Sequence, residues 1–122
     1  MTKKEYYKNL IIVDFDDTLC IHPKDNKSDI KNGSPNINLI NTLNSLFNEG
    51  YNIEILTARG HFSCDNRIHA EQIYRPIIEE WLKEHNVKYT TLNFNKPYGI
   101  IYIDDKAVRP NELKKIEKLI KG

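Results

Sequence analysis

The sequence is poor in the features that anchor proteins in membranes or stabilise secreted ones. It has only two cysteines, Cys20 and Cys64, which are too few and too irregularly spaced for a disulfide framework. No apolar run approaches the ~20 residues that span a bilayer. The first nine residues are almost wholly polar or tyrosine and lack the apolar core of a signal peptide. We therefore expect a cytoplasmic protein with reduced thiols and no membrane partner.

The sequence also lacks an excess of charge of either sign. Its 18 basic and 17 acidic side chains leave a formal net charge of +1. Nucleic acids and anionic membranes attract strongly basic surfaces, so this balance does not favour either partner. With 122 residues, of which 39% are hydrophobic, the chain is long enough for one core. We expect a single domain that covers residues 1–122.

Short apolar segments alternate with amphipathic ones, which predicts an α/β fold. Strands are expected at residues 10–13, 51–56, 88–92 and 99–103, and helices at residues 35–49, 67–85 and beyond 110. Ser34 is expected to cap the first helix, and Pro76 either kinks the second or marks the start of its main part. A polar loop or short hairpin is expected at residues 23–34. Such alternation implies a mostly parallel sheet covered by helices on both faces.

Polar residues stand where three of these strands end. Asp14, Thr57 and Asp104 each follow an apolar segment. In a parallel sheet the carboxyl ends of the strands share one edge, and ligands bind there. We therefore expect these residues to meet at one rim.

The acidic residues after the first strand suit phosphate chemistry. Asp14 and Asp16, two residues apart, can face one site. One carboxylate can attack phosphorus to give an aspartyl-phosphate, while a second carboxyl group protonates the leaving alcohol and later activates water. Two anions would repel a phosphate unless a cation lay among them, and Mg²⁺ prefers such oxygen ligands. Asp104 and Asp105 offer a second source of ligands.

Several other side chains can meet an anionic substrate. Thr57 can donate a hydrogen bond to a phosphoryl oxygen, and Lys96 can neutralise it as a point charge. Arg59, Arg67 and Arg109 are further candidates.

A zinc site is a weaker alternative for the remaining polar loop residues. Cys20 and His22 could combine with His61 and Cys64 only if their two loops met. The spacing matches no known zinc motif, so we expect ordinary loop residues.

Together these residues resemble the four-motif signature of the haloacid dehalogenase (HAD) superfamily, over nearly the whole chain. The motifs are an Asp-x-Asp-x-Thr segment, a threonine at a strand end, a lysine, and an Asp-Asp pair at another strand end. The matching residues here are Asp14, Asp16, Thr18, Thr57, Lys96, Asp104 and Asp105. The resemblance implies a Rossmann-like three-layer sandwich with a mostly parallel sheet and a Mg²⁺-dependent phosphatase activity.

The resemblance also implies a role for each motif. Asp14 would be the nucleophile and a metal ligand. Asp16 would be the acid/base and would ligate Mg²⁺ through its backbone carbonyl. Asp104 would ligate the metal, with Asp105 in support. The residues expected to bind the phosphate group are Thr18, Thr57, Arg59 and Lys96.

Longer matching stretches point to one subgroup, the phosphatases assigned to capsule-polysaccharide biosynthesis. These stretches are residues 56–59, 76–82, 95–97 and 103–110. The chain departs from the superfamily at Asp17, where glycine is common, and from the subgroup near residues 97–99, where the loop is short.

The spacing of the motifs leaves no room for a cap domain. Only 16 residues separate Thr18 from Pro35, and Thr57 leads within ten residues into the next helix. A capless site is open. It suits a bulky sugar-, polyol-, glycan- or nucleotide-linked phosphate, or else a second subunit of a homo-oligomer closes it.

Three other interpretations stay open. A receiver domain has a similar acidic pocket, but its phosphorylated aspartate would precede the threonine and lysine, whereas here the Asp104-Asp105 pair comes last. A catalytically idle HAD-like binding module is a second alternative. A polynucleotide-end phosphatase is the third, and the neutral charge balance argues against it.

Overall fold

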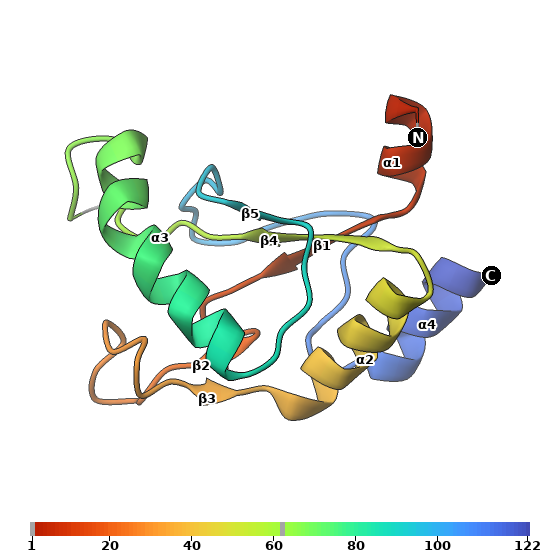
Figure 1. Ribbon diagram of the computed structural model, residues 1–122, viewed down its shortest axis with the longest axis horizontal. Coiled ribbons are helices and arrows are strands. Elements are labelled where there is room, and N and C mark those ends of the chain that lie inside the picture. The colour runs from red at the N-terminus through yellow and green to blue at the C-terminus, as the bar shows by residue number, and fades with distance from the viewer. Residues whose placement is uncertain (1, 62) are drawn as a thin grey trace.

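A parallel three-stranded sheet runs through the middle of the computed structural model, which describes residues 2–61 and 63–122 (Figure 1). The strands lie in the order β1 (Leu10–Asp14), β4 (Asn52–Leu56) and β5 (Thr91–Asn93), and both pairs are parallel. The register places Asp14 opposite Leu56 and Leu56 opposite Asn93, so the three carboxyl ends are level. The structure confirms the predicted α/β class and parallel sheet, and the arrangement is compatible with a Rossmann-like sandwich.

Two helices connect these strands. α2 (Ile37–Asn48) leads from the first part of the chain to β4, and α3 (Arg67–Glu84) leads from β4 to β5. Asparagine side chains cap both helices: Asn36 accepts a hydrogen bond from the Leu39 N–H, and Asn66 accepts one from the His69 N–H. α3 begins at the predicted residue, ends one residue before the predicted end, and runs through Pro76 without a break in the helix. α4 (Leu113–Lys121) follows near the end of the chain and packs beside α2 (Figure 1).

A small antiparallel hairpin follows β1. β2 (Cys20–Ile21) pairs with β3 (Ser34–Pro35), which confirms the hairpin expected around residues 23–34. Ser34 was expected to cap the helix, and this prediction was wrong. Ser34 lies in β3 because its segment pairs with Ile21, so α2 begins later, after Asn36.

A short helix, α1 (Lys3–Lys8), precedes the sheet and was not predicted. Its signal is a capping box, in which the Thr2 hydroxyl accepts from the Glu5 N–H and the Glu5 carboxylate accepts from the Thr2 N–H. Within residues 2–61 and 63–122, no helix combines the length and apolar character needed to cross a membrane.

The core lies where α2 and α3 meet the sheet. Trp81 and Phe15 are almost fully buried and pack edge to face, with ring centroids 5.4 Å apart. Ile53 and Ile55 of β4 are buried at alternating positions, as a strand with one side in the core requires. Each such buried side chain contributes roughly 1.5–3 kcal/mol. This packing fixes the sheet whose carboxyl edge carries the candidate site.

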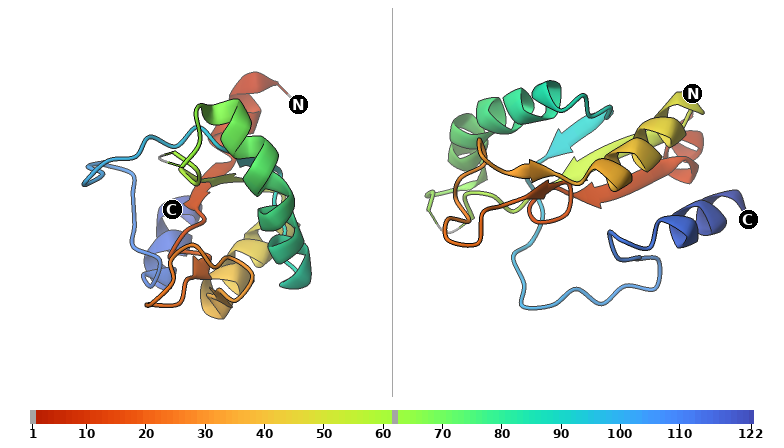
Figure 2. Two further views of the ribbon diagram at one scale, coloured as in Figure 1. Left: turned by 90° about the vertical axis from the view of Figure 1, so that its left-hand side faces the viewer. Right: turned by 90° about the horizontal axis from the view of Figure 1, so that it is seen from below.

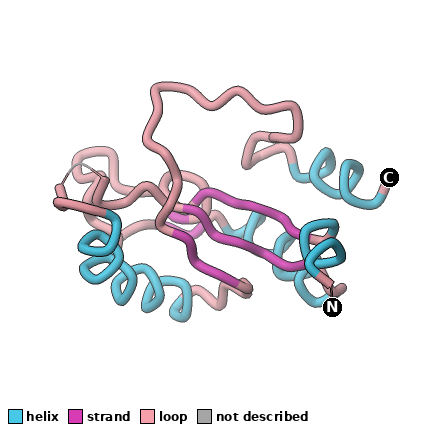
Figure 3. The backbone as a smooth tube through the Cα atoms, turned by 90° about the horizontal axis from the view of Figure 1, so that it is seen from above, coloured by secondary structure: helices cyan, strands magenta, loops and turns pink. Residues whose placement is uncertain are grey.

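The prediction of a strand at residues 99–103 was wrong for this structure. This segment belongs to a long loop that swings away from the sheet before α4 (Figures 2 and 3). Ile100 and Ile103 are 104% and 91% exposed. The loop is tied to itself instead of to the sheet, because the Tyr102 hydroxyl donates to the Pro97 carbonyl and accepts from the Gly99 N–H.

Candidate active site

A cleft of about 590 Å³ lies beyond the carboxyl ends of β1 and β4. Asp14 ends β1, Asp16 follows it, and Arg59 comes shortly after β4. Lys96, shortly after β5, also lines the cleft. The structure therefore brings four of the predicted site residues together at one edge of the sheet, as parallel strands require.

Two groups hold the Asp14 carboxylate. The Lys96 ammonium lies 2.8 Å from Oδ1, and the Thr18 hydroxyl donates to Oδ2 at 3.2 Å. Burial raises the pKa of Asp14 above its usual value, the Lys96 partner partly offsets this rise, and the negative charge of Asp16 adds to it. Asp14 is thus a desolvated carboxylate next to a cation, which is the setting of an activated nucleophile.

Three side chains hold the Asp16 carboxylate. The Thr57 hydroxyl donates to Oδ2 at 2.8 Å. Oδ1 lies 2.8 Å from His22 Nε2 and also contacts the Arg59 guanidinium. Because these partners come from the hairpin and from the loop after β4, Asp16 links two separate segments at the base of the cleft.

The turn after β1 places the two acids on the same side. Phe15, between them, is fully buried, while Asp14 and Asp16 line the cleft. Asp17 has a φ of +55°, a left-handed conformation that aspartate tolerates better than most residues. Its carboxylate accepts from the His22 N–H at 3.1 Å and pairs with Lys27 at 3.3 Å. Burial acts against ionisation of Asp17, but these two partners outweigh it and hold the pKa below its usual value.

Thr57 is buried and does not line the cleft. Its N–H donates to the Asn93 carbonyl, and its hydroxyl is used by Asp16. Thr18 similarly donates to Asp14. In this structure the two threonines orient the acids, and a direct phosphate contact remains a prediction.

The three arginines have different positions. Arg59 lines the cleft, and its buried Nε has no hydrogen-bond partner within residues 2–61 and 63–122. Arg67 was a candidate for the substrate, but its guanidinium donates to the backbone carbonyls of Phe94 and Lys96 and so braces the loop that carries the lysine. Arg109 lies outside the cleft lining.

Asp104 and Asp105 are not brought to the cleft. Both are exposed, and the Asp104 carboxylate accepts from the Lys106 N–H at 2.7 Å in a local turn. The cause is the unpaired segment before them, since residues 99–103 do not extend the sheet. Among the described residues, no three His, Cys, Asp or Glu side chains are grouped to hold a metal ion. Ligation of Mg²⁺ by Asp104 and Asp105 stays a prediction.

The cleft also contains side chains that the sequence did not single out. Lys27 reaches it from the hairpin loop, and Tyr74 reaches it from α3. Tyr98 stacks on His61 with ring centroids 6.1 Å apart, and the Lys96 ammonium lies 4.4 Å from the centroid of the Tyr102 ring. No motif marks these residues, because tertiary contacts bring their segments to the site.

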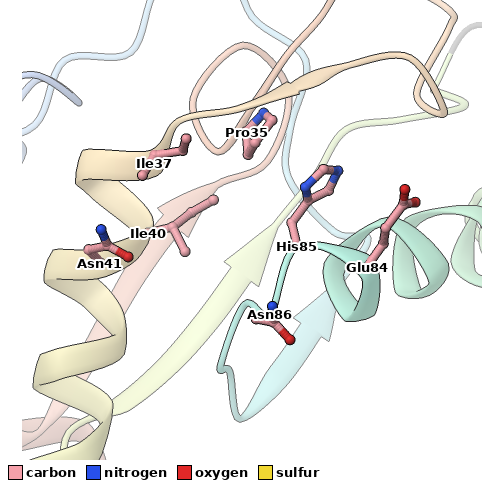
Figure 4. Close-up of a pocket in the computed structure, with 7 residues that line it drawn as sticks. All are labelled: Pro35, Ile37, Ile40, Asn41, Glu84, His85 and Asn86. Atoms are coloured by element: carbon pink, nitrogen blue, oxygen red, sulfur yellow. The ribbon is translucent and has the colours of Figure 1, made fainter.

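A second, smaller cleft of about 230 Å³ lies where β3 leads into α2 and α3 ends (Figure 4). Its lining contains a single carboxylate, Glu84, and a single imidazole, His85. It lacks the paired acids of the first cleft and so offers no comparable chemistry.

A comparison with solved structures shows a similarity over almost the whole chain. The chain is similar to a crystallised target protein from Vibrio cholerae, with 34% sequence identity and a TM-score of 0.76. The match covers 93% of this chain and 97% of that one. No family model matches the chain, and no curated protein does.

Proposed function

We propose that this chain, which belongs to the same family as the Vibrio cholerae protein, is a capless, Mg²⁺-dependent phosphomonoester hydrolase of the HAD type. The observation that carries the proposal is the pair of acids in one cleft, each held by different partners. Asp14 is paired with a lysine, whereas Asp16 is bonded to threonine, histidine and arginine. Unequal environments of this kind suit two carboxyl groups with different tasks.

The proposed reaction has two steps. Asp14 attacks phosphorus, the bond from phosphorus to the ester oxygen breaks, and Asp16 gives its proton to that oxygen. The Asp16 carboxylate then takes a proton from water, which attacks phosphorus, releases inorganic phosphate and restores Asp14. Both steps balance with water as the only co-reactant.

Cationic groups around the acids would offset the charge of the phosphoryl group. Lys96 and Arg59 both line the cleft. The donor set also fits Mg²⁺, which commonly takes one or two carboxylates besides phosphate and water. The charge of Asp16 helps to raise the pKa of Asp14, a repulsion that a cation relieves. Asp14 and Asp16 would hold the ion, and it would neutralise developing charge on the phosphoryl oxygens.

Asp104 and Asp105 would join the metal site only if their segment moved. The edge of β1 that faces away from β4 has no partner strand among the described residues. Residues 100–103 are apolar and exposed, although such a run favours burial in a sheet. We include ligation by Asp104 in the proposal, with pairing of this segment along β1 as its requirement.

The cleft favours a substrate larger than phosphate itself. It is open, and Tyr74, Tyr98 and Tyr102 line it beside the charged residues. Aromatic faces of this kind can pack against a sugar ring or a nucleobase. The proposed substrates are therefore sugar-, polyol- or nucleotide-linked phosphates. Capsular polysaccharide biosynthesis is the pathway that the sequence resemblance implies.

The test is release of inorganic phosphate from a panel of monoesters in the presence of Mg²⁺. The panel spans sugar phosphates, polyol phosphates, nucleotides and oligonucleotide ends. We expect turnover of at least one ester, and its loss with Asp14→Asn and with a chelator. Turnover that survives Asp14→Asn would refute the assigned nucleophile. A correctly folded protein that turns over no ester, including an activated aryl phosphate, would refute the hydrolase.

A further inference from the structure

His22 is a buried histidine that directly contacts the candidate acid/base. Only 4% of the residue is exposed, and its Nε2 lies 2.8 Å from Asp16 Oδ1. Burial of a polar side chain costs free energy unless its hydrogen bonds are satisfied. The position of His22 is therefore a specific feature of the site, although the chemistry proposed above gives it no role.

Both ring nitrogens of His22 contact polar groups. Nε2 lies 2.8 Å from Asp16 Oδ1 and 2.8 Å from Arg59 Nη2. Arginine can only donate, so Nε2 accepts from Arg59 in one tautomer and donates to an ionised Asp16 in the other. The other nitrogen, Nδ1, lies 3.8 Å from Cys20 Sγ. Burial raises the pKa of Cys20 to about 12, so its thiol keeps a proton that it can share with Nδ1. Each ring nitrogen thus has a polar neighbour inside the site.

The hairpin seats this histidine closely. The His22 N–H donates to Asp17 Oδ1 at 3.1 Å. On the other side, a Cβ added at Gly33 would lie 2.2 Å from Cys20 Sγ, so only glycine fits behind the thiol. The Gly33 carbonyl accepts from Trp81 Nε1 at 3.0 Å, which ties the hairpin to the core. These contacts fix the hairpin around His22, whose Nε2 lies against Asp16 and Arg59.

We propose that His22 is a positioning residue for Asp16, whose carboxyl group it orients toward the leaving oxygen of the substrate. This inference rests on the proposed hydrolase. Thr57 holds the other oxygen of Asp16, so the two contacts together fix the plane of the carboxyl group. Arg59 contacts the same oxygen as His22, so loss of the imidazole leaves Asp16 partly held.

The test exploits the leaving group. An alkyl phosphate needs a proton for its leaving oxygen, whereas p-nitrophenyl phosphate departs as a stable anion and needs little help. The measured quantity is kcat/KM for both esters, because it reports the step in which the leaving group departs. We compare the wild-type protein with His22→Asn and His22→Gln. The Gln amide N–H can reach roughly the place of Nε2, while that of Asn falls short.

We expect His22→Asn to lower kcat/KM for the alkyl ester by about tenfold and that for the aryl ester by less than about twofold. His22→Gln should recover most of the alkyl activity. The ratio of the two esters within one variant does not depend on how much of the protein is folded, so a partly unfolded variant still gives an answer.

Equal losses on both esters, or no loss on either, would overturn the positioning role. A failure of the hydrolase itself is distinguishable, because the wild-type protein would then turn over neither ester. Normal wild-type turnover with an unchanged ester ratio in His22→Asn refutes the positioning role alone.

Discussion

Two segments of this chain have nearly the same sequence pattern and different structures. Residues 10–14 and residues 100–105 are both short apolar runs that end in aspartate. The first is β1, which pairs along its whole length with β4 and places Asp14 in the cleft. The second is an exposed loop that leaves Asp104 in a local turn.

The difference shows that strand tendency and sheet membership are separate properties. Both runs have residues that fit a pleated surface, but a strand also needs a partner for its backbone hydrogen bonds. β1 has such a partner in β4, so it is a strand even though the Ile12 side chain is 58% exposed. The second run is held to itself through Tyr102. The predictions below test how far stability and function depend on the first region and on the second.

The largest effect is expected at the ion pair that holds the first region. Lys96→Gln removes the ammonium 2.8 Å from Asp14. Activity should fall about 100-fold, because an electrostatic partner of the reacting group is lost. Lys96 also lowers the pKa of Asp14, so its removal raises that pKa further. Since the nucleophile must be ionised, the acid limb of the kcat/KM profile should move to higher pH. An unmoved acid limb would contradict the pairing.

A matched pair of truncations compares the packing of the two regions. Val13→Ala in β1 removes a buried side chain and should lower the free energy of unfolding by about 2 kcal/mol. Ile103→Ala removes an exposed one and should change it by less than about 0.5 kcal/mol without Mg²⁺. Urea titrations measure both values. Equal costs without Mg²⁺ would mean that residues 99–103 are already packed in the sheet.

The second region is tested functionally through its metal dependence. If pairing along β1 brings Asp104 to the site, Asp104→Asn should raise the Mg²⁺ concentration for half-maximal activity about tenfold. Glu117→Gln, an exchange at an exposed acid outside the cleft lining, is the matched control. An unchanged Mg²⁺ requirement in Asp104→Asn would confine the metal site to the first region.

The smallest effect concerns Asp14, at the end of the first region, and Asp17, in the turn after it, whose pKa values shift in opposite directions. The pKa of Asp17 lies below its usual 3.8. Its ionised form therefore stabilises the fold above pH 3.8, and this contribution is lost as the pH falls through the lowered pKa. Asp17→Asn should be less stable than wild type at pH 7, and the difference should shrink below pH 3.8. Asp14→Asn should show the opposite sign at pH 7, because the pKa of Asp14 is raised. Thermal unfolding at several pH values measures both differences in stability. A pH-independent difference between Asp17→Asn and the wild type would contradict the account.

Much of the first region could be predicted from the sequence. The apolar run before Asp14 and the alternation before Thr57 fix two adjacent parallel strands, and the carboxyl ends of such strands meet. Lys96 follows the next strand and reaches the same edge. These inferences need only local patterns and the geometry of a parallel sheet.

The remaining features depend on tertiary contacts that local patterns do not contain. The hairpin brings His22 and Lys27 to the cleft that holds the two acids. No periodic pattern in the sequence predicts this placement. Arg67 has the sequence character of a substrate contact, yet its partners are backbone carbonyls near residue 95. The run before Asp104 has the local pattern of a strand. Whether it joins the sheet depends on a pairing partner, which the local pattern does not reveal.

The most direct test of the account is identification of the residue that carries phosphate during turnover. The protein is mixed with a substrate ester and Mg²⁺, quenched in acid and treated with borohydride, which reduces an acyl phosphate to an alcohol. Peptide mass spectrometry then locates the reduced side chain. The account predicts reduction at Asp14 alone, dependent on substrate. Reduction at Asp104 or Asp105, or none under conditions of steady phosphate release, would contradict it.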